Sequence, residues 1–155
     1  MEGKTCCVTG HRKIPLEKIQ YVKDRLTEEI AGAIEDGYTN FISGFASGSD
    51  LYFAEIVKSY IDRGLKLSLE AAIPYRKRYR ALMNDTDNSA LLLACSNIKV
   101  LSENYSINSF MKRNLYMIEN SELVIAVYDG RNKGGTFNTI RAAERMNRQV
   151  LRIMI

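Results

Sequence analysis

The chain has 155 residues, of which 46% are hydrophobic and 26% charged, and its formal net charge at pH 7 is +4. This length and composition predict one globular domain, residues 1–155, whereas the modest positive charge does not choose between a nucleic acid and a phosphate-bearing small ligand. No apolar run reaches the roughly 20 residues of a membrane span and no signal-peptide core is visible, so we expect a cytoplasmic protein without a membrane partner.

The cysteines and the single histidine exclude two further classes of protein. Cys6 and Cys7 are adjacent in an expected strand, where their side chains would point to opposite faces, and Cys95 ends an apolar run. Without a Cys-x-x-Cys pair or a second histidine, neither a disulfide framework nor a structural zinc site is expected. We interpret the thiols as small hydrophobic side chains and assign no metal-binding residue.

In chain order, short apolar runs alternate with segments of helical periodicity. Val22, Leu26 and Ile30, for example, recur at helical spacing before a stop signal at Gly37. The pattern predicts strands at 4–9, 39–43, 65–74, 98–101, 123–128 and 150–155. It predicts helices at 15–37, 51–64, 110–120 and 137–147, with two short helices within 75–96.

This alternation predicts an α/β fold, a Rossmann-like, doubly wound parallel sheet of about six strands in three layers. The run 123–128 is the most apolar strand, which is expected at the centre of a sheet covered on both faces. The default order for such a fold places the first strand between the second and the fourth. Ligands of these folds bind at the carboxyl ends of the strands, where the winding reverses.

Four polar loops fall at that edge of the predicted sheet. They follow the first, second, fourth and fifth strands and cover residues 9–12, 43–50, 102–108 and 129–136. All are rich in glycine, hydroxyl groups, amides or charged side chains. Because function concentrates on loops held by a rigid scaffold, this edge is the predicted site.

The loop 43–50 joins a strand to a helix through small residues. Gly44 and Gly48 would let backbone N–H groups approach a phosphate, with Ser43 as a further donor. The alternative is a tight strand-to-helix turn without a ligand. Asp50 either accepts a hydrogen bond from a ribose hydroxyl or caps the following helix.

The loop 129–136 repeats the anion-binding pattern. Gly134, Gly135 and Thr136 precede the last expected helix, although a flexible connector would have a similar composition. Arg12 and Arg113 are the candidate phosphate clamps, because a guanidinium holds two oxygens at once. The alternative for each arginine is a solvated surface side chain. We interpret the densest basic cluster, 76–80, as a solvated helix face.

Other polar side chains beside these loops have two interpretations each. Asn114 either reads a base or ribose edge or ties two loops together, and His11 either transfers protons or is structural. Asp129 either binds a sugar or a water, or only turns the chain. The predicted ligand site holds Thr9, Gly10, His11, Arg12, Ser43, Gly44, Gly48, Asp50, Arg113, Asn114, Asp129, Gly134, Gly135 and Thr136.

These motifs, in this order, resemble the YpsA-like branch of the SLOG superfamily. The resemblance lies in the runs 6–12, 38–44 with Gly48 and Asp50, 111–114, and 123–130 followed by 134–136, and it spans almost the whole chain. It implies a Rossmann-like fold, a pocket for a nucleotide-derived ligand such as ADP-ribose or NAD, and a tendency to form homo-oligomers. The wider superfamily includes the cytokinin-activating phosphoribohydrolases and the DNA-processing protein DprA.

The chain departs from the phosphoribohydrolases of that superfamily. Their motif is Pro-Gly-Gly-x-Gly-Thr-x-x-Glu, whereas residues 133–139 read Lys-Gly-Gly-Thr-Phe-Asn-Thr and lack the proline, a glycine and the glutamate. The next glutamate, Glu144, lies further along the helix. No Gly-x-Ser-x-Gly elbow is present either, so neither a catalytic residue nor a cofactor is assigned.

Three functions remain open. We favour binding of a nucleotide or nucleotide-derived ligand by a sensor or regulatory module. The alternative is a nucleotide-processing N-glycosidase or phosphoribohydrolase-like enzyme with Asp129 or Glu144 as acid or base, which the missing glutamate disfavours. The second alternative is DprA-like binding of single-stranded DNA, a nucleic-acid partner that we do not favour, because few aromatic side chains are interleaved with a basic stripe.

Overall fold

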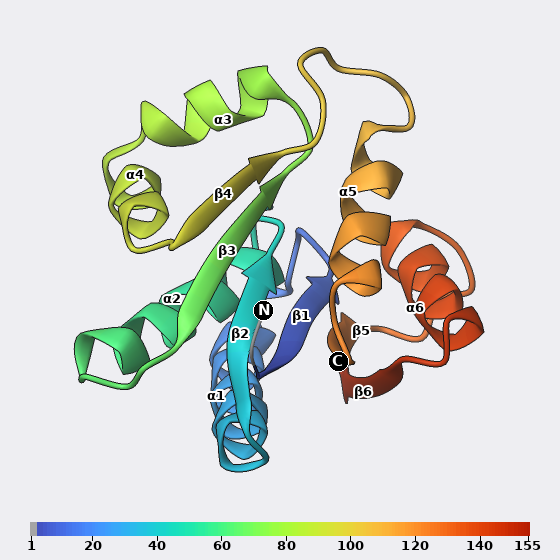
Figure 1. Cartoon of the computed structure of the whole chain (residues 1–155). Coiled ribbons are helices and arrows are strands. Elements are labelled where there is room, and N and C mark those ends of the chain that lie inside the picture. The colour runs from blue at the N-terminus through green and yellow to red at the C-terminus, as the bar shows by residue number, and fades with distance from the viewer. Residues whose placement is uncertain (1–2) are drawn as a thin grey trace.

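The computed structural model describes residues 3–155, along which strands and helices alternate as predicted (Figure 1). The strands are β1 (Lys4–Gly10), β2 (Tyr38–Ser43), β3 (Ser68–Ile73), β4 (Asn97–Val100), β5 (Leu123–Tyr128) and β6 (Gln149–Met154). The helices are α1 (Ile19–Glu35), preceded by a 3-10 turn η1 (Leu16–Lys18), α2 (Ser49–Asp62), α3 (Arg76–Met83), α4 (Thr86–Leu93), α5 (Ser109–Glu119) and α6 (Gly135–Arg145). Among residues 3–155, no helix is long and apolar enough to cross a membrane.

The strands of the described chain form one parallel sheet in the order β4-β3-β2-β1-β5-β6, which confirms the predicted doubly wound α/β fold. The expected neighbour of β1 is wrong, because β5 and not β4 lies beside it. Burial explains the difference. β4 has four residues and none of them is buried, as an edge strand tolerates, whereas all six residues of β5 are buried.

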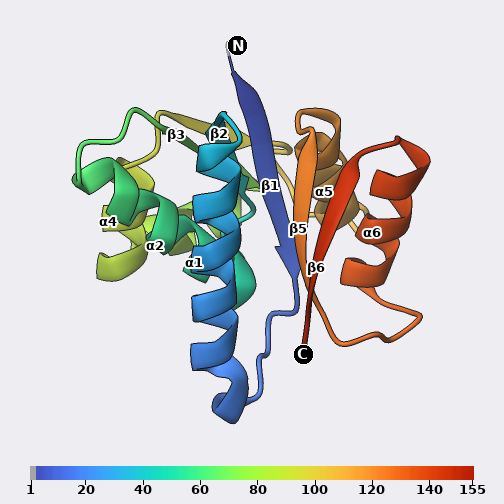
Figure 2. The ribbon, with the colours of Figure 1, turned by 90° about the horizontal axis from the view of Figure 1, so that it is seen from below.

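Helices cover both faces of the sheet. α1 and α2 pack with Cys6 and Val8 of β1 on one face, and α5 and α6 pack with Cys7 on the other, so the two cysteines point to opposite faces as predicted. Figure 1 shows these two helix pairs on opposite sides of the strands, and Figure 2 shows β1, β5 and β6 side by side between α1 and α6. The winding reverses between β1 and β5, which is where such sheets bind ligands.

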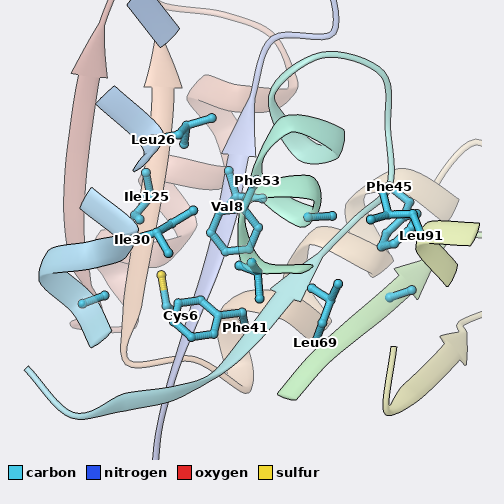
Figure 3. Close-up of a cluster of buried hydrophobic side chains, with 14 of the residues drawn as sticks. Cys6, Val8, Leu26, Ile30, Phe41, Phe45, Phe53, Leu69, Leu91 and Ile125 are labelled. Carbon is cyan, nitrogen blue, oxygen red and sulfur yellow. The ribbon is translucent and has the colours of Figure 1, made fainter. Parts of the chain in front are cut away.

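The larger core lies between the sheet and the pair α1 and α2 (Figure 3). Leu26 and Ile30 of α1 are fully buried there, as their helical spacing predicts. Phe41 of β2 and Phe53 of α2 pack at a tilt with their ring centroids 6.0 Å apart. Each such side chain contributes roughly 1.5–3 kcal/mol by leaving water. This core fixes the ends of β1 and β2, from which the site is built.

Glycines mark the ends of α1 and α2 and the start of α6. Gly37 after α1 and Gly64 after α2 have φ of 92° and 97°, the left-handed region that side chains disfavour. Several predicted boundaries are wrong by two to four residues. α1 begins only at Ile19 and β3 only at Ser68, whereas α2 and α6 each begin two residues before their predicted starts, at Ser49 and Gly135. Gly134, with φ of 99°, already turns the chain into α6.

Candidate functional site

A cavity of about 370 Å³, here called the first cavity, lies at the carboxyl ends of β1 and β5. Small-molecule sites typically have volumes of about 300–1,000 Å³. The segments after these strands, the start of α6, one side of α5 and part of the turn 43–50 form its walls. The predicted residues that line it are Thr9, Gly10, His11, Arg12, Asp50, Arg113, Asn114, Gly134, Gly135 and Thr136.

The remaining predicted residues lie outside the first cavity. Gly44 lines a second cavity beside it, and Ser43 and Gly48 line neither. Asp129 also lines neither cavity and pairs with Arg131. The predicted loop 102–108 arches beyond the strand ends (Figure 1) and contributes no lining residue to either cavity. That any of these residues binds a ligand stays a prediction.

Arg113 of α5 is the buried centre of the site, with 4% of its surface exposed. Its Nη1 donates to the carbonyl oxygen of Gly44 at 2.7 Å and to that of Ala72 at 3.5 Å, at the ends of β2 and β3. Its Nε donates to Oδ1 of Asn114 at 2.8 Å. Burial lowers the pKa of Arg113. Neutral oxygens thus hold the guanidinium in place. Among residues 3–155, no carboxylate forms an ion pair with it.

Asn114 extends this arrangement to the start of α6. Its Nδ2 donates to Oγ1 of Thr139 at 3.1 Å, and that hydroxyl donates to the carbonyl oxygen of Gly135 at 2.8 Å. Because the amide oxygen of Asn114 accepts from Arg113, both ends of its amide are engaged. Asn114 therefore ties α5 to α6 and fixes Gly134 and Gly135 relative to the Arg113 guanidinium.

The turn 43–50 is closed by its own side chains. Oγ of Ser43 donates to the carbonyl oxygen of Asp50 at 2.8 Å and accepts from the N–H of Phe45 at 3.2 Å. A Cβ at Gly44 would lie 2.6 Å from Oδ2 of Asp50 and 2.7 Å from Nη1 of Arg113. Glycine at position 44 therefore lets a carboxylate and a guanidinium approach the chain closely, and it is needed for protein packing.

Phe45 anchors the turn in the core. Its φ is 55°, in the left-handed region, and its side chain is fully buried. A bulky residue in this region costs about 1–3 kcal/mol, which burial of the aromatic ring offsets. Figure 3 shows the ring beside Leu91 of α4, within the larger core. The turn consequently has a fixed shape without a ligand.

Asp50 is a carboxylate of the cavity wall, with 7% of its surface exposed. Its Oδ2 accepts from the N–H of Ala46 at 3.4 Å, and α2 has no side-chain cap at Gly48, so Asp50 stabilises the turn and does not cap the helix. Burial raises the pKa of Asp50 from the usual 3.8 to about 6, although the charge of Arg113 acts in the opposite direction. Asp50 therefore titrates close to neutral pH.

Gly48 holds the turn against the segment after β1. Its φ is 80°, and a Cβ would lie 2.6 Å from the carbonyl oxygen of Arg12 and 2.8 Å from that of His11. We expect Gly48→Ala to lower the free energy of unfolding by about 2 kcal/mol, measured by urea denaturation. Gly32→Ala in α1 is the control, because nothing lies within 4 Å of the added Cβ and alanine stabilises a helix by about 0.5–1 kcal/mol. Equal effects of the two substitutions would contradict this role of Gly48.

His11 links the segments after β1 and β5. Its Nε2 lies 3.1 Å from the backbone nitrogen of Asp129 and 3.2 Å from Oδ1 of the same residue. One nitrogen cannot accept from an N–H and donate to a carboxylate at once. Burial lowers the pKa of His11, which favours the neutral ring with Nε2 as the acceptor. His11 is thus a structural link in this structure.

The two carboxylates considered as acid or base are engaged in ion pairs. Both oxygens of Asp129 accept from Nε of Arg131, at 3.0 and 2.9 Å, and these hydrogen bonds hold its pKa well below the usual range. Glu144 lines neither cavity and pairs with Arg152 of β6 at 2.9 Å. Neither group is placed to exchange a proton in the first cavity.

Arg12 is positioned by an aromatic ring. Its guanidinium carbon lies 4.5 Å from the ring centroid of Phe110, which belongs to an edge-to-face cluster with Tyr75 and Tyr105. Such cation–π contacts contribute about 0.5–1 kcal/mol at exposed sites and use none of the N–H donors. Within residues 3–155, the Arg12 side chain forms no hydrogen bond and no ion pair, so its donors are available to a ligand.

A second cavity of about 170 Å³ adjoins the first. Arg12, Phe110 and Arg113 line both, and Arg78 of α3 lines only the second. Sequence reasoning missed Arg78, since nothing in the basic run 76–80 distinguishes one arginine from its neighbours. The available signal was that α3 follows β3, whose carboxyl end lies at the same sheet edge. Phe110 was missed too, although it lies one helical turn before Arg113.

The donors of the site suit an anion. They are guanidinium groups, a threonine hydroxyl and the first backbone N–H groups of α6. Among residues 3–155, no group of three or more His, Cys, Asp or Glu side chains could hold a metal ion.

Known proteins share this fold. The structure of DNA processing protein A from Helicobacter pylori, described for its single-stranded DNA binding mode, superimposes with a TM-score of 0.66 at 18% identity, over 96% of this chain and 64% of that chain. This chain thus spans less than two thirds of that protein. The X-ray structure of TM1055 superimposes with a TM-score of 0.59 at 17% identity, over 95% of this chain and 72% of that chain. At these identities the comparisons establish the fold alone.

Sequence comparison identifies the family. The Bacillus subtilis (strain 168) SPbeta prophage-derived protein YoqJ, itself uncharacterised, is 28% identical over 139 residues, which cover 80% of this chain and 81% of YoqJ. The family model YpsA, described as the YspA SLOG family, matches residues 6–154. This match includes every segment that forms the two cavities and confirms the resemblance seen in the motifs. The chain belongs to the YspA SLOG family.

Proposed function

We propose that this protein binds a nucleotide or nucleotide-derived ligand in the first cavity, as a sensor or regulatory module. One observation carries the proposal: the start of α6 and two guanidinium groups, those of Arg12 and Arg113, line the same cavity. Gly134 and Gly135 leave the first N–H groups of this eleven-residue helix accessible to a phosphate. No side chain crowds Gly135, since nothing lies within 4 Å of its Cβ position.

The other lining residues suit the nucleoside part of such a ligand. The carboxylate of Asp50 and the second amide N–H of Asn114 are available to a ribose or a base, and Phe110 and Val8 supply apolar surface. Membership of the SLOG family supports the same class of ligand. The proposal assigns no reaction, because Asp129 and Glu144 are engaged in ion pairs.

Calorimetric titration of the full chain with ADP-ribose, NAD and ATP tests this proposal. We expect Arg12→Gln to weaken binding about 10- to 100-fold, because contacts of a charged donor with phosphate contribute about 1.5–3 kcal/mol. Lys13→Gln is the matched control, since it removes the same charge from the next exposed position, outside both cavities. The proposal fails if no nucleotide binds, or if both variants bind like the unmodified chain.

A second candidate function is binding of single-stranded DNA. It is favoured by the cluster of Tyr75, Tyr105 and Phe110, whose members pack edge to face beside Arg12, and by the 61% exposure of Tyr105. Bases stack on such side chains next to basic grooves. Fluorescence anisotropy with a labelled oligothymidine, compared at about 50 and 200 mM salt, should show a steep loss of affinity. Absence of binding at the lower salt concentration would exclude this function.

A further inference from the structure

We infer that the second cavity is a separate phosphate subsite, and that the ligand is a nucleotide with phosphate groups on two different ribose positions. A nucleoside 3′,5′-bisphosphate represents this class. The inference deepens the proposed function of the first cavity and rests on it. It concerns Arg78, Arg12 and Arg113, which line the second cavity together with Phe110 and Tyr75.

Neutral groups hold all three arginines in place. Nη2 of Arg78 donates to the carbonyl oxygen of Phe45 at 2.9 Å, and Nη1 of Arg113 donates to that of Gly44 at 2.7 Å. Arg12 lies against the ring of Phe110. Across residues 3–155, none of the three arginines takes part in an ion pair. The side chains are therefore fixed without loss of their positive charge.

The three charges repel one another. Burial lowers the pKa of Arg113, and the charges of Arg12 and Arg78 lower it further. The charges of all three arginines lower the pKa of the same carboxylate, that of Asp50, so three positive charges are set against one acidic group. An anion in the second cavity would relieve the repulsion. Phosphate is the expected anion, because its oxygens match the paired donors of a guanidinium.

The partition between the cavities sets the arrangement of the two phosphates. Arg12, Ala46, Phe110 and Arg113 line both cavities and hence form this partition. In a pyrophosphate one bridging oxygen joins the two phosphoryl groups, so we expect both to lie on the same side of the partition. Phosphates on the 5′ and 3′ oxygens project from opposite sides of a ribose, so they can occupy both cavities at once.

Isomeric ligands test this inference. ADP and adenosine 3′,5′-bisphosphate both contain one adenosine and two phosphates, and AMP contains one phosphate fewer. By calorimetry on the full chain, we expect the bisphosphate to bind about 10-fold more tightly than ADP. Arg78→Gln should remove this preference, with a loss of about 10-fold for the bisphosphate and less than about 2-fold for AMP. Lys77→Gln, an exposed neighbour on α3, should change neither affinity.

A second variant separates charge from folding. Arg78→Lys keeps the charge but loses the paired donors, and we expect it to bind the bisphosphate with intermediate affinity. Thermal unfolding of both variants reports on the lost hydrogen bond to Phe45. The inference is overturned if ADP and the bisphosphate bind equally, if Arg78→Gln weakens AMP and the bisphosphate alike, or if only a long oligothymidine responds to Arg78. If AMP binds and Arg78 has no effect, this inference alone fails; if no nucleotide binds, the proposed function fails with it.

Discussion

Replacement of Arg113 by methionine is expected to lower the free energy of unfolding by about 3–5 kcal/mol at pH 8, measured by urea denaturation. Methionine keeps most of the apolar stem but leaves the carbonyl oxygen of Gly44 and Oδ1 of Asn114 without their donors. The buried Asp50 also loses the charge that most strongly lowers its pKa. Arg145→Met, at an exposed position of α6, should change stability by less than about 0.5 kcal/mol.

A double-mutant cycle separates hydrogen bonding from charge in this prediction. In an Asp50→Asn background, Arg113→Met should be less costly at pH 8, because no buried carboxylate is left uncompensated. At pH 4 the two backgrounds should give similar costs, since Asp50 is then protonated in the folded chain. A stability of Arg113→Met equal to that of the unmodified chain would show that Arg113 is not the centre of the site.

Asp50→Asn is expected to raise the free energy of unfolding by about 2–3 kcal/mol at pH 8. The folded-state pKa of Asp50 is about 6 against the usual 3.8, and each pKa unit corresponds to about 1.4 kcal/mol. A raised pKa means that the folded chain binds the proton more tightly than the unfolded chain. The stability that protonated Asp50 contributes to the unmodified chain is therefore fully present below about pH 4 and is lost as the pH rises through 6.

The pH dependence identifies Asp50 as the source of this effect. The stability difference between Asp50→Asn and the unmodified chain should vanish below about pH 4 and grow to its full size by about pH 7. His11 titrates in both proteins, so its lowered pKa cancels in the difference. Affinity for ADP-ribose, whose phosphates stay ionised, should rise about 2- to 10-fold from pH 8 to 5.5 in the unmodified chain only. A stability difference independent of pH would contradict the assignment.

Local patterns determined most of the fold. The spacing of Val22, Leu26 and Ile30 predicted the buried face of α1, and the apolar run of β5 predicted a strand that is covered on both faces. β5 is buried as expected, but it lies next to the edge strand β6 and not at the centre of the sheet. Strand order was harder, because β4 and β5 both follow helices and their burial distinguishes the edge strand from the interior one. Burial depends on contacts between distant segments, which local patterns do not encode.

The residues that line the first cavity were predictable where they belong to loops that follow strands. Arg12, Gly134 and Gly135 were predicted to lie at this edge because they belong to a loop after a strand or stand at the start of a helix, and all three line the first cavity. Arg78 was not found, because its place beside the second cavity depends on how α3 packs against the turn 43–50. For the same reason, the glycines of that turn were expected to serve a ligand, whereas Gly48 faces the backbone of the segment after β1.

Phe45 has a consequence for redesign of this protein. Because its ring belongs to the core, the turn 43–50 cannot change its path unless the packing around Leu91 changes as well. The segments 102–108 and 129–135 carry no such anchor, since nearly all of their residues are exposed. Libraries that vary residues 131–133, of which Arg131 and Lys133 line the first cavity, should therefore alter the ligand preference of the proposed site at little cost in expression yield. Variation of 102–108, which lines neither cavity, should leave that preference unchanged, whereas randomisation of the turn should mainly produce insoluble chains.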